Sequence, residues 1–504
     1  MSPDQAFREA DPSLNDRSAP QKYTIEGSDG STWELVCGLE VHAELATATK
    51  MFSGAPNQFG SEPNSNIDPV TLGLPGSLPV LNGRAVELAM RLGLAVNCTV
   101  ERSVFSRKNY FYPDMPKDFQ ISQYDLPINV DGWLELPSGA RIGIERAHLE
   151  EDTGKSSHVG GDGRITGSAY SLVDYNRAGV PLLEVVSRPD ITSPDEARAY
   201  AAELRAVLVA TGASDGKMEE GSMRVDANVS VRPPGATELG TRCEIKNLNS
   251  MRSLGRAIDY EARRQVELLL AGERVRQETR HWNEGDGRTH TMRSKEEAED
   301  YRYFPEPDLV PLDPDREWIE RVRSELPALP ADRRRGLAAA AGVDLPHEGI
   351  TVIVERDQDA QALGAIEAGA DPSRVLVHVE QNLSAPGGAG LDAGRLAELV
   401  KLETAGQLTA TQAKAVLAEL LTSGASPAKV AQAKGFEAMD DHATAGLVDQ
   451  AIAEHPDEWE RFRAGDAKAR GKLSGFFVGQ VMKASRGQAD GKAVTALLNA
   501  RLGQ

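Results

Sequence analysis

Residues 31–45, STWELVCGLEVHAEL, alternate apolar and polar side chains with a period of two, and this pattern limits the possible folds most strongly. One face of the segment is apolar: Trp33, Leu35, Cys37, Leu39, Val41, Ala43 and Leu45. The other face carries Glu34, Glu40, His42 and Glu44. A period of two is that of a β-strand with one buried face. The segment therefore predicts a strand whose open face is rich in acids.

Other segments repeat this pattern. MRVDANVSVR (223–232) places Arg224, Asp226 and Asn228 on one face, TRCEIKN (241–247) alternates similarly, and VPLLEVVS (180–187) has strand-like apolar neighbours around Glu184. A helix is predicted from the cap at Ser193 to Gly212, and a second from about Leu254 to Leu270.

The character of the chain changes after the proline-rich stretch YFPEPDLVPLDPD, because residues 316–504 place Ala, Leu, Glu and Lys at helical spacing. Only residues 350–382 interrupt this with short apolar runs. We predict an α+β chain with a disordered extension (1–30), a sheet-based domain (31–310), a helical middle domain (311–405) and a helical tail domain (406–504).

Charge and composition argue against several classes of protein. The net charge of −20 argues against a general nucleic-acid coat, although residues 470–504 carry six basic side chains against one acid. The polar N-terminus and the lack of a long apolar run predict a cytoplasmic protein without a membrane span. Three widely separated cysteines form neither a zinc knuckle nor a disulfide framework.

The segment HLEEDTGKSSH (148–158) contains Gly-Lys-Ser but is not a Walker A loop, because Leu149 stands where that motif needs its first glycine. Its acidic pair, Glu150 and Glu151, suits a site in which a metal ion lies between protein and phosphate. Lys155 could still contact a phosphate.

Glu40 and His42 share a strand face, and alternate residues on a strand lie roughly 7 Å apart. They could ligate one ion if Glu150 or Glu151 and Glu184 come from other strands. Carboxylates with at most one imidazole favour Mg²⁺ or Mn²⁺ over Zn²⁺. The alternative is a solvated acidic strand, which is the preferred interpretation for Glu44.

Two further groups have alternative interpretations. The aromatic stretch 107–125, with Lys108 and Lys117, could stack on a base and hold phosphates, or could simply pack on the sheet. Arg224, Asp226 and Asn228 could bind phosphate, metal-bound water and a ribose, or could face solvent. The chain has no G-x-S-x-G motif and no catalytic cysteine pattern, so nothing in it predicts release of ammonia from an amide.

Seven motifs, in order, closely resemble the B subunits of bacterial aspartyl/glutamyl-tRNA amidotransferases. They are GLEVHAEL, KNYFYPDMPKDFQISQYD, HLEEDTGKSSH, VDYNRAGVPLLEVVSRPD, KMEEGSMRVDANVSVRP, EIKNLNS and DYRYFPEPD. The resemblance is dense over residues 33–310 and looser to the end, where LSGFFVGQVMKASRGQA is similar to the family's tail. It implies a cradle domain built on a sheet, a helical middle domain and a helical tail that contacts tRNA.

The resemblance also implies an activity and partners. The side-chain carboxylate of Glu on tRNA(Gln), of Asp on tRNA(Asn), or of both is phosphorylated by ATP, and ammonia then displaces phosphate. An amidase partner, the A subunit, makes the ammonia from glutamine, and the small C subunit completes a heterotrimer. A non-catalytic tRNA-binding scaffold is the alternative function.

Carried over to this chain, the resemblance assigns the catalytic metal site to Glu40, His42, Glu151 and Glu184. It assigns the nucleotide side of the site to Lys108, Lys155, Arg224, Asp226 and Asn228. Some family members carry a cysteine cluster for zinc, but Ser53, Ala55, Asp68 and Thr71 occupy those positions here. We therefore predict ATP and Mg²⁺, or Mn²⁺ in its place, without zinc, and a loop ordered by packing or by partner contacts.

Overall fold

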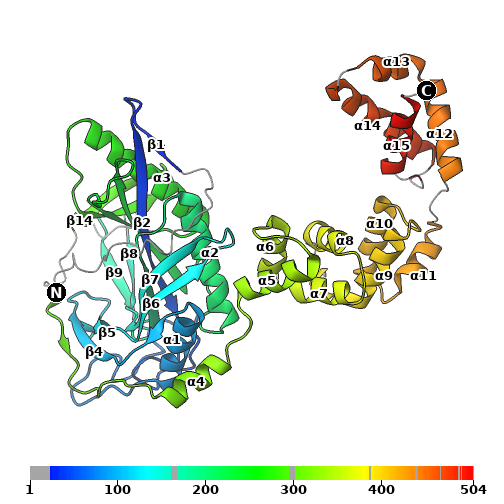
Figure 1. Cartoon of the computed structure of the whole chain (residues 1–504). Helices are drawn as coiled ribbons and strands as arrows, with labels where there is room; N and C mark the ends of the chain where they lie inside the picture. The colour runs from blue at the N-terminus through cyan, green and yellow to red at the C-terminus, as the bar shows by residue number, and fades with distance from the viewer. Residues whose placement is uncertain are drawn as a thin grey trace. The chain divides into compact units, whose positions relative to one another are not determined.

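The computed structural model describes residues 23–160, 167–294, 301–384, 388–436, 441–465, 467–485, 489 and 491–502. The chain divides into two compact units, Met1–Ala331 and Asp332–Gln504. The described strands all belong to the first unit and the second is helical (Figure 1), which confirms the predicted α+β class.

The strands of the first unit are β1 (Ile25–Glu26), β2 (Thr32–Glu44), β3 (Thr99–Val100), β4 (Val104–Asn109), β5 (Phe119–Leu126), β6 (Asn129–Glu135), β7 (Arg141–Glu151), β8 (Lys155–Val159), β9 (Tyr170–Asp174), β10 (Pro181–Ser187), β11 (Met223–Arg232), β12 (Cys243–Lys246), β13 (Glu278–Asn283), β14 (Arg288–Ser294) and β15 (Phe304–Pro305). Its helices are α1 (Gly83–Ala95), α2 (Pro194–Ala210), α3 (Met251–Leu270) and α4 (Arg316–Ser324).

Thirteen strands form one sheet, in the order β14-β13-β12-β11-β2-β10-β7-β5-β4-β15, with β1, β3 and β6 paired beside this path. β8 and β9 form a separate two-stranded sheet. The long strand β2 lies between β11 and β10 and pairs antiparallel with both. Residues of β2 therefore face partners from strands that follow much later in the sequence.

The predicted alternation of β2 is confirmed. Leu35, Cys37, Leu39, Val41 and Ala43 are at most 1% exposed and belong to the core of the first unit. Helices α2 and α3 pack against each other and against the apolar side of β2 and β11, while α1 packs on β7. The opposite side of the sheet is thereby left for polar side chains.

The two predicted helices are present as α2 and α3. The Ser193 side chain accepts a hydrogen bond from the amide of Glu196, and Gly212 ends the helical segment with φ +67°. The second helix starts at Met251, three residues before the predicted start, because the Ser250 side chain caps it by accepting from the amide of Ser253.

Of the extension predicted over residues 1–30, residues 1–22 lie outside the described residues. The remainder contributes β1, which pairs antiparallel with the start of β2. Ile25 is fully buried in the core. These last residues are thus part of the fold.

The helices of the second unit and its entry are α5 (Pro330–Ala341), α6 (Glu348–Glu355), α7 (Asp359–Glu367), α8 (Pro372–Val377), the π-helix η4 (His378–Asn382), the 3₁₀-helix η5 (Gly388–Gly390), α9 (Ala393–Thr404), α10 (Ala410–Leu420), α11 (Pro427–Ala433), α12 (Asp441–Glu454), α13 (Pro456–Ala464), α14 (Ala467–Ala484) and α15 (Gly491–Arg501). Residues 350–382, whose sequence interrupts the helical pattern, are mostly helical too.

Two separate apolar clusters fill this unit. One runs from Leu337 to Ala431 with Phe436 packed against it, and the other runs from Val448 to Leu498. The first cluster includes side chains on both sides of residue 405, where the sequence places a boundary. None of the helices in the described parts of the chain combines the length and hydropathy that a membrane span requires.

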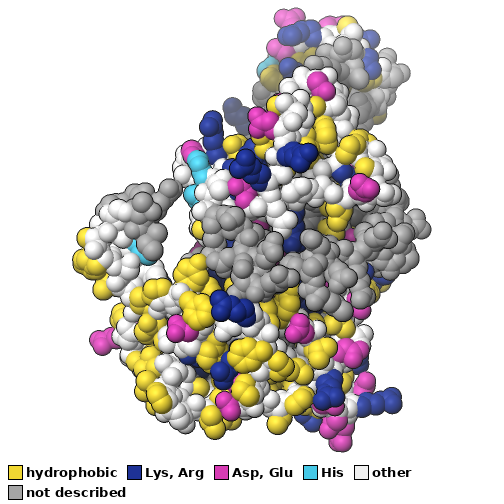
Figure 2. Space-filling view, turned by 90° about the vertical axis from the view of Figure 1, so that its left-hand side faces the viewer, with side chains coloured by type: hydrophobic (Ala, Val, Ile, Leu, Met, Phe, Trp, Pro, Cys, Tyr) yellow, Lys and Arg dark blue, Asp and Glu magenta, His cyan; other side chains and the backbone are white. Residues whose placement is uncertain are grey.

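The face of the molecule in Figure 2 carries hydrophobic side chains gathered in its lower half, with charged side chains of both signs scattered among them. Several large hydrophobic residues are exposed around β4 and β5: Phe111, Tyr112 and Leu126 are 63%, 41% and 50% exposed. The Lys and Arg side chains that are coloured in this view are scattered over it.

Candidate functional site

The polar face of the sheet is the side that carries Glu40, His42 and Glu44 of β2. The pairing register places His42 directly opposite Glu184 of β10 and directly opposite Arg224 of β11. Directly opposite residues in antiparallel strands project to the same side of a sheet. Three strands that are distant in the sequence therefore bring their charged side chains to one surface.

His42, Glu150 and Glu184 form a compact cluster on this face. The His42 Nε2 atom lies 3.4 Å from Oε2 of Glu184 and 3.9 Å from Oε1 of Glu150. One potential ligand atom from each of the three residues lies within 4.8 Å of the others. Glu150 comes from β7, two residues after His148, which faces Glu184 across the next strand pair.

The charges of the cluster are strongly coupled. Burial alone would lower the pKa of His42, but the hydrogen bond and charge of Glu184, with the charge of Glu150, raise it to about 9. Burial and the neighbouring charge of Glu184 raise the pKa of Glu150 to about 7. Burial would also raise the pKa of Glu184, yet His148 and His42 hold it well below its usual range. The negative charges of Glu184 and Glu150 thus stabilise a proton on His42.

The donor set of this cluster fits a hard divalent cation. Two carboxylates and one imidazole offer mostly oxygen ligands, which Mg²⁺ and Mn²⁺ prefer. Such a cation would replace the proton on His42, since a metal-binding imidazole must be neutral. The pairing of β2, β10 and β7 fixes the backbone positions of all three residues.

The predicted ligand Glu151 lies on the other side of the sheet and is not part of the cluster. Both of its carboxylate oxygens accept hydrogen bonds from the Lys117 ammonium, at 2.7 and 2.6 Å, and one also accepts from the Ile121 amide at 3.0 Å. Adjacent strand residues point to opposite faces, so only one of Glu150 and Glu151 can meet His42. Glu150 is the one that lies in the cluster.

The sequence did contain a signal for this choice. In RAHLEE, Arg146, His148 and Glu150 share one phase of the alternation, and the apolar residues Ala147 and Leu149 share the other. In a strand with one buried face, the polar set of alternate residues is expected on the open, polar face of the sheet. Following this phase along β7 would have selected Glu150 and drawn attention to His148.

Glu40 is on the polar face but interacts beside the cluster. Its Oε1 atom accepts a hydrogen bond of 2.8 Å from the Asn228 side chain. Asp226, opposite Glu40 on β11, accepts a hydrogen bond of 2.7 Å from the Lys246 ammonium. These side chains form a row next to the cluster, in which three predicted site residues lie close together.

Arg224 is anchored on the opposite flank of His42. Its guanidinium donates a hydrogen bond of 2.5 Å to Asp152, which also lies 3.5 Å from Arg177. Glu44 lies beside this pair, and burial together with the charge of Asp152 raises the pKa of Glu44 to about 7. Glu44 is only partly exposed, so the structure does not support its interpretation as a fully solvated surface acid.

Lys108 of β4 lies on the same face of the sheet as Glu150, because it pairs with Gln120 of β5, two residues before Ser122, the partner of Glu150. Burial would lower the pKa of its ammonium, but the charges of Tyr303, Glu150 and Glu184 raise it. The ammonium also lies 4.9 Å from the centre of the Tyr301 ring, within range of a cation–π interaction. Lys108 is thus a half-buried cation on the face that carries the acidic cluster. No local pattern in the sequence predicted that Tyr301 and Tyr303 would lie near its ammonium.

Lys155 is placed differently. It is exposed at the start of the separate β8–β9 sheet, where it pairs with Asp174 in the strand register. Of the five residues predicted for the nucleotide side, Arg224, Asp226 and Asn228 are neighbours on β11, Lys108 lies on the same face of the sheet on β4, and Lys155 stands apart.

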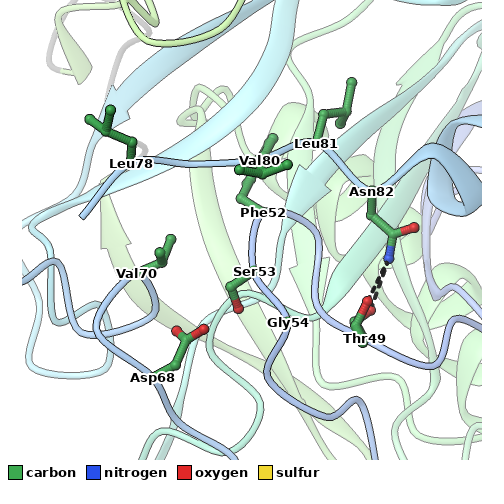
Figure 3. A pocket seen from close by; sticks show the side chains of 10 residues that line it. All are labelled: Thr49, Phe52, Ser53, Gly54, Asp68, Val70, Leu78, Val80, Leu81 and Asn82. Carbon is green, nitrogen blue, oxygen red and sulfur yellow. Dashed lines mark hydrogen bonds between the residues drawn. The ribbon is translucent and has the colours of Figure 1, made fainter.

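The loop that would carry zinc ligands in other family members lines a cavity of about 360 Å³. In Figure 3, the side chains of Ser53 and Asp68 point toward each other. Burial raises the pKa of Asp68, but hydrogen bonds from Thr71 and Ser53 outweigh it and lower that pKa. The Thr49 hydroxyl also accepts from the Asn82 amide at 3.2 Å. Packing and hydrogen bonds hold this loop.

Sequence comparisons connect both units to known proteins. Residues 35–320 match a family described as the GatB/GatE catalytic domain, and residues 375–502 match one described as the GatB domain. The B subunit of an aspartyl/glutamyl-tRNA(Asn/Gln) amidotransferase from Thermosynechococcus vestitus is 47% identical over 503 residues, which cover 96% of this chain and 99% of that protein. The B subunits of the same name from Kineococcus radiotolerans and Frankia casuarinae are 48% and 49% identical, covering 94% of this chain and 97% and 96% of their own lengths.

Proposed function

The chain belongs to the family of aspartyl/glutamyl-tRNA(Asn/Gln) amidotransferase B subunits, and from this membership we propose how its polar face serves the reaction. The protein is part of a glutamine-dependent carbon–nitrogen ligase, in which it acts on misacylated tRNA together with the amidase (A) and small (C) subunits. We place the reaction in the cytoplasm, where translation uses its product.

The proposed chemistry has two balanced steps. An oxygen of the substrate's side-chain carboxylate attacks the γ-phosphorus of ATP, which forms an acyl phosphate and releases ADP. Ammonia then attacks the acyl carbon, inorganic phosphate leaves, and the surplus proton of the nitrogen is lost to give the amide. Activation is needed because a carboxylate is a poor electrophile, whereas phosphate is a good leaving group.

The observation that carries this proposal is the cluster of His42, Glu150 and Glu184. These residues would hold a divalent cation, and such a cation neutralises phosphate charge and aligns the transferring group. Without a counter-ion, two carboxylates at the cluster would repel a triphosphate. A bound divalent cation would offset this repulsion.

The chain's own cations would act on the phosphates around this cluster. Lys108 of β4 lies on the same face as Glu150, and Arg224 is held by Asp152 on the other flank of His42. Cationic side chains that already occupy their positions need to move little when negative charge develops on the transferring phosphate. Glu150 and His148 are 4% and 3% exposed, so these two side chains of the polar face are themselves largely shielded from water.

The helical tail is proposed to contact tRNA, but fewer of its basic residues are available than the sequence suggests. Arg501 is paired with Asp449 at 2.9 Å, and Arg470 donates to the carbonyl of Arg463. Lys472 and Lys483 are exposed on α14. Arg486, Asp490 and the side chain of Lys492 lie outside the described residues.

A test follows the fate of oxygen atoms in the assembled complex. Glu-tRNA(Gln) labelled with ¹⁸O in the side-chain carboxylate is incubated with ATP and ammonium, and inorganic phosphate is analysed by mass spectrometry. Carboxylate phosphorylation must transfer one ¹⁸O atom to phosphate for each amide formed. Phosphate without label would overturn the proposed chemistry.

The scaffold alternative is tested in the same assay with His42→Asn. We expect this variant to lose amide formation by at least about a hundredfold, because a direct ligand should matter no less than the outer partners of metal sites, whose loss typically costs 10–100-fold. His290→Asn, which changes a 43% exposed histidine on β14, is the matched control. Full activity of His42→Asn would favour a scaffold.

A further inference from the structure

The motif DYRYFPEPD, to which the proposed chemistry assigns no role, runs antiparallel to β4, where Phe304 pairs with Arg107. Continuing this register by one residue sets Tyr303 opposite Lys108. Directly opposite residues of antiparallel strands project to the same side of a sheet. We name residues 301–306 the aromatic strap. The strap thus brings a tyrosine to the face that carries the acidic cluster.

The two residues that flank Lys108 in the sequence hold the strap to β4. Arg107 donates to both carboxylate oxygens of Glu306, at 2.6 and 2.9 Å, and the Glu306 side chain is 0% exposed. Asn109 donates from its side chain to the backbone carbonyls of Tyr301 and Arg302, at 2.8 and 3.0 Å. A bidentate arginine–carboxylate pair fixes geometry as well as distance. Both ends of the strap are therefore tied down beside Lys108.

The strap bends between its two tyrosines. Arg302 has a left-handed backbone, with φ +45°. Such a conformation is uncommon for residues other than glycine and persists where surrounding contacts determine it. The side chain of Arg302 is exposed, whereas the backbone on both sides of its Cα atom is bonded to Asn109 or its neighbour on the strap. The bend is therefore a fixed feature that sets the position of Tyr301.

Three tyrosine rings form a chain that ends at Lys108. The ring of Tyr303 stacks on Tyr124 of β5, with 4.4 Å between centroids and 13° between planes. The ring of Tyr301 meets that of Tyr303 edge to face, at 6.0 Å and 70°. Both are favoured arrangements of aromatic pairs. Tyr301 then lies 4.9 Å from the Lys108 ammonium, so a ring anchored on β5 determines where that contact is made.

A ring face suits a cation that must act on phosphate. A lysine ammonium ends a flexible four-carbon stem and needs a contact to stay in one place. A carboxylate partner would hold it but would neutralise its charge. An aromatic face attracts the ammonium through the ring quadrupole and carries no net charge. Among the described residues the Lys108 ammonium has the Tyr301 ring beside it and no carboxylate ion pair, so its positive charge stays available.

We propose that the aromatic strap positions Lys108 for phosphoryl transfer, with Tyr301 and Tyr303 as positioning residues that act through its ammonium. The inference rests on the proposed function, in which Lys108 acts on the phosphates of ATP. The rings supply the position of the ammonium, and Lys108 supplies the charge. Loss of a ring should therefore cost rate only while the ammonium is present.

The experiment measures the rate of amide formation in a single turnover of the assembled complex, with Glu-tRNA(Gln) radiolabelled in the amino acid. Tyr301→Leu removes the ring, and Tyr301→Phe keeps it without the hydroxyl group. Each variant is made in the native chain and in a Lys108→Met chain. Phe304→Leu, which changes a 43% exposed ring of the same strap, is the matched control.

We expect Tyr301→Leu to slow amide formation by at least about tenfold in the native chain and by less than about twofold in the Lys108→Met chain, because residues that act through one group are not additive. Tyr301→Phe should stay within about twofold of the native rate, since it keeps the aromatic face. Phe304→Leu should keep the native rate. Equal slowing of both chains by Tyr301→Leu, as a merely structural role predicts, would overturn the inference.

Two further comparisons guard against variants that fold or turn over poorly. Tyr303→Leu, with Tyr303→Phe as its control, breaks the link to Tyr124 and should show the same dependence on Lys108. The affinity for inorganic tripolyphosphate with Mg²⁺, measured by calorimetry, gives the comparison without turnover. There too, Tyr301→Leu should weaken binding only while Lys108 is present. Full rate and full affinity for both leucine variants would overturn the inference.

The ¹⁸O experiment on the wild-type complex separates this inference from the proposed function. Phosphate without label removes the phosphoryl transfer itself, whatever the tyrosine variants do. If label is transferred and Tyr301→Leu slows the native and Lys108→Met chains equally, only the role of the aromatic strap fails.

Discussion

His42 and Glu184 face each other across the antiparallel pair of β2 and β10, with 3.4 Å between the imidazole Nε2 atom and a carboxylate oxygen. The residues are far apart in the sequence, and only strand pairing makes them neighbours. Glu150 adds a second carboxylate from β7. The proposed phosphoryl transfer depends on this arrangement of three side chains from three strands.

The choice between Glu150 and Glu151 can be measured directly. We expect Glu150→Gln to weaken Mn²⁺ binding, followed by electron paramagnetic resonance, by at least about tenfold because it removes a ligand. Glu151→Gln should leave the Mn²⁺ affinity within about twofold, since Glu151 lies on the other face with Lys117. The opposite order of effects would restore Glu151 as the ligand.

The buried pair of Lys117 and Glu151 should matter for stability. Their side chains are 7% and 4% exposed, so Lys117→Met leaves a buried carboxylate without its counter-charge. We expect the free energy of unfolding of the first unit to fall by about 3–5 kcal/mol, measured by urea denaturation. The double variant Lys117→Met/Glu151→Met should recover most of this loss. Additive losses would show that the two residues act independently.

Lys50 should give the first unit a stability that depends on pH. It is 1% exposed, with its ammonium 2.6 Å from the carbonyl of Ala178. Burial lowers the pKa of Lys50 to about 8 from its ordinary 10.5, although Asp68 and Glu151 act in the opposite direction. Between these values the unfolded chain binds more protons, so stability rises as pH increases.

Lys50→Arg removes this titration, because a guanidinium stays charged over the same range. The melting temperatures of wild type and Lys50→Arg are measured by scanning calorimetry. Relative to the variant, the wild type should gain a few degrees between about pH 7.5 and about pH 9.5. A constant difference over this range would show that the Lys50 ammonium is not penalised by burial.

A chain that ends at Phe436 tests the role of the last apolar cluster, which starts beyond that residue. We expect the thermal transition of the first unit to stay unchanged, because its core contains no residue from the tail. Affinity for tRNA should fall, and its dependence on salt should become shallower, since phosphate contacts release counter-ions. The comparison is made by filter binding at several salt concentrations. Unchanged affinity and slope would show that residues 437–504 do not contribute to the tRNA interface.

Much of the fold was accessible from local pattern. The alternation around His42 predicted β2, and the Ser193 cap predicted the start of α2, because both depend on residues close in sequence. Residues 350–382 were harder, since their short apolar runs suit a buried helix as well as a strand. The structure makes them mostly helical.

The sequence by itself determined which side chains each strand presents on its polar face, because the period of two is a local property of extended backbone. It thereby placed Glu40, His42 and Glu44 together. Only the tertiary structure decided that β10 and β7 meet β2 in the register that joins Glu184 and Glu150 to His42. A shift of one residue would have turned Glu151 to the polar face instead, and such a register is set by packing between distant segments.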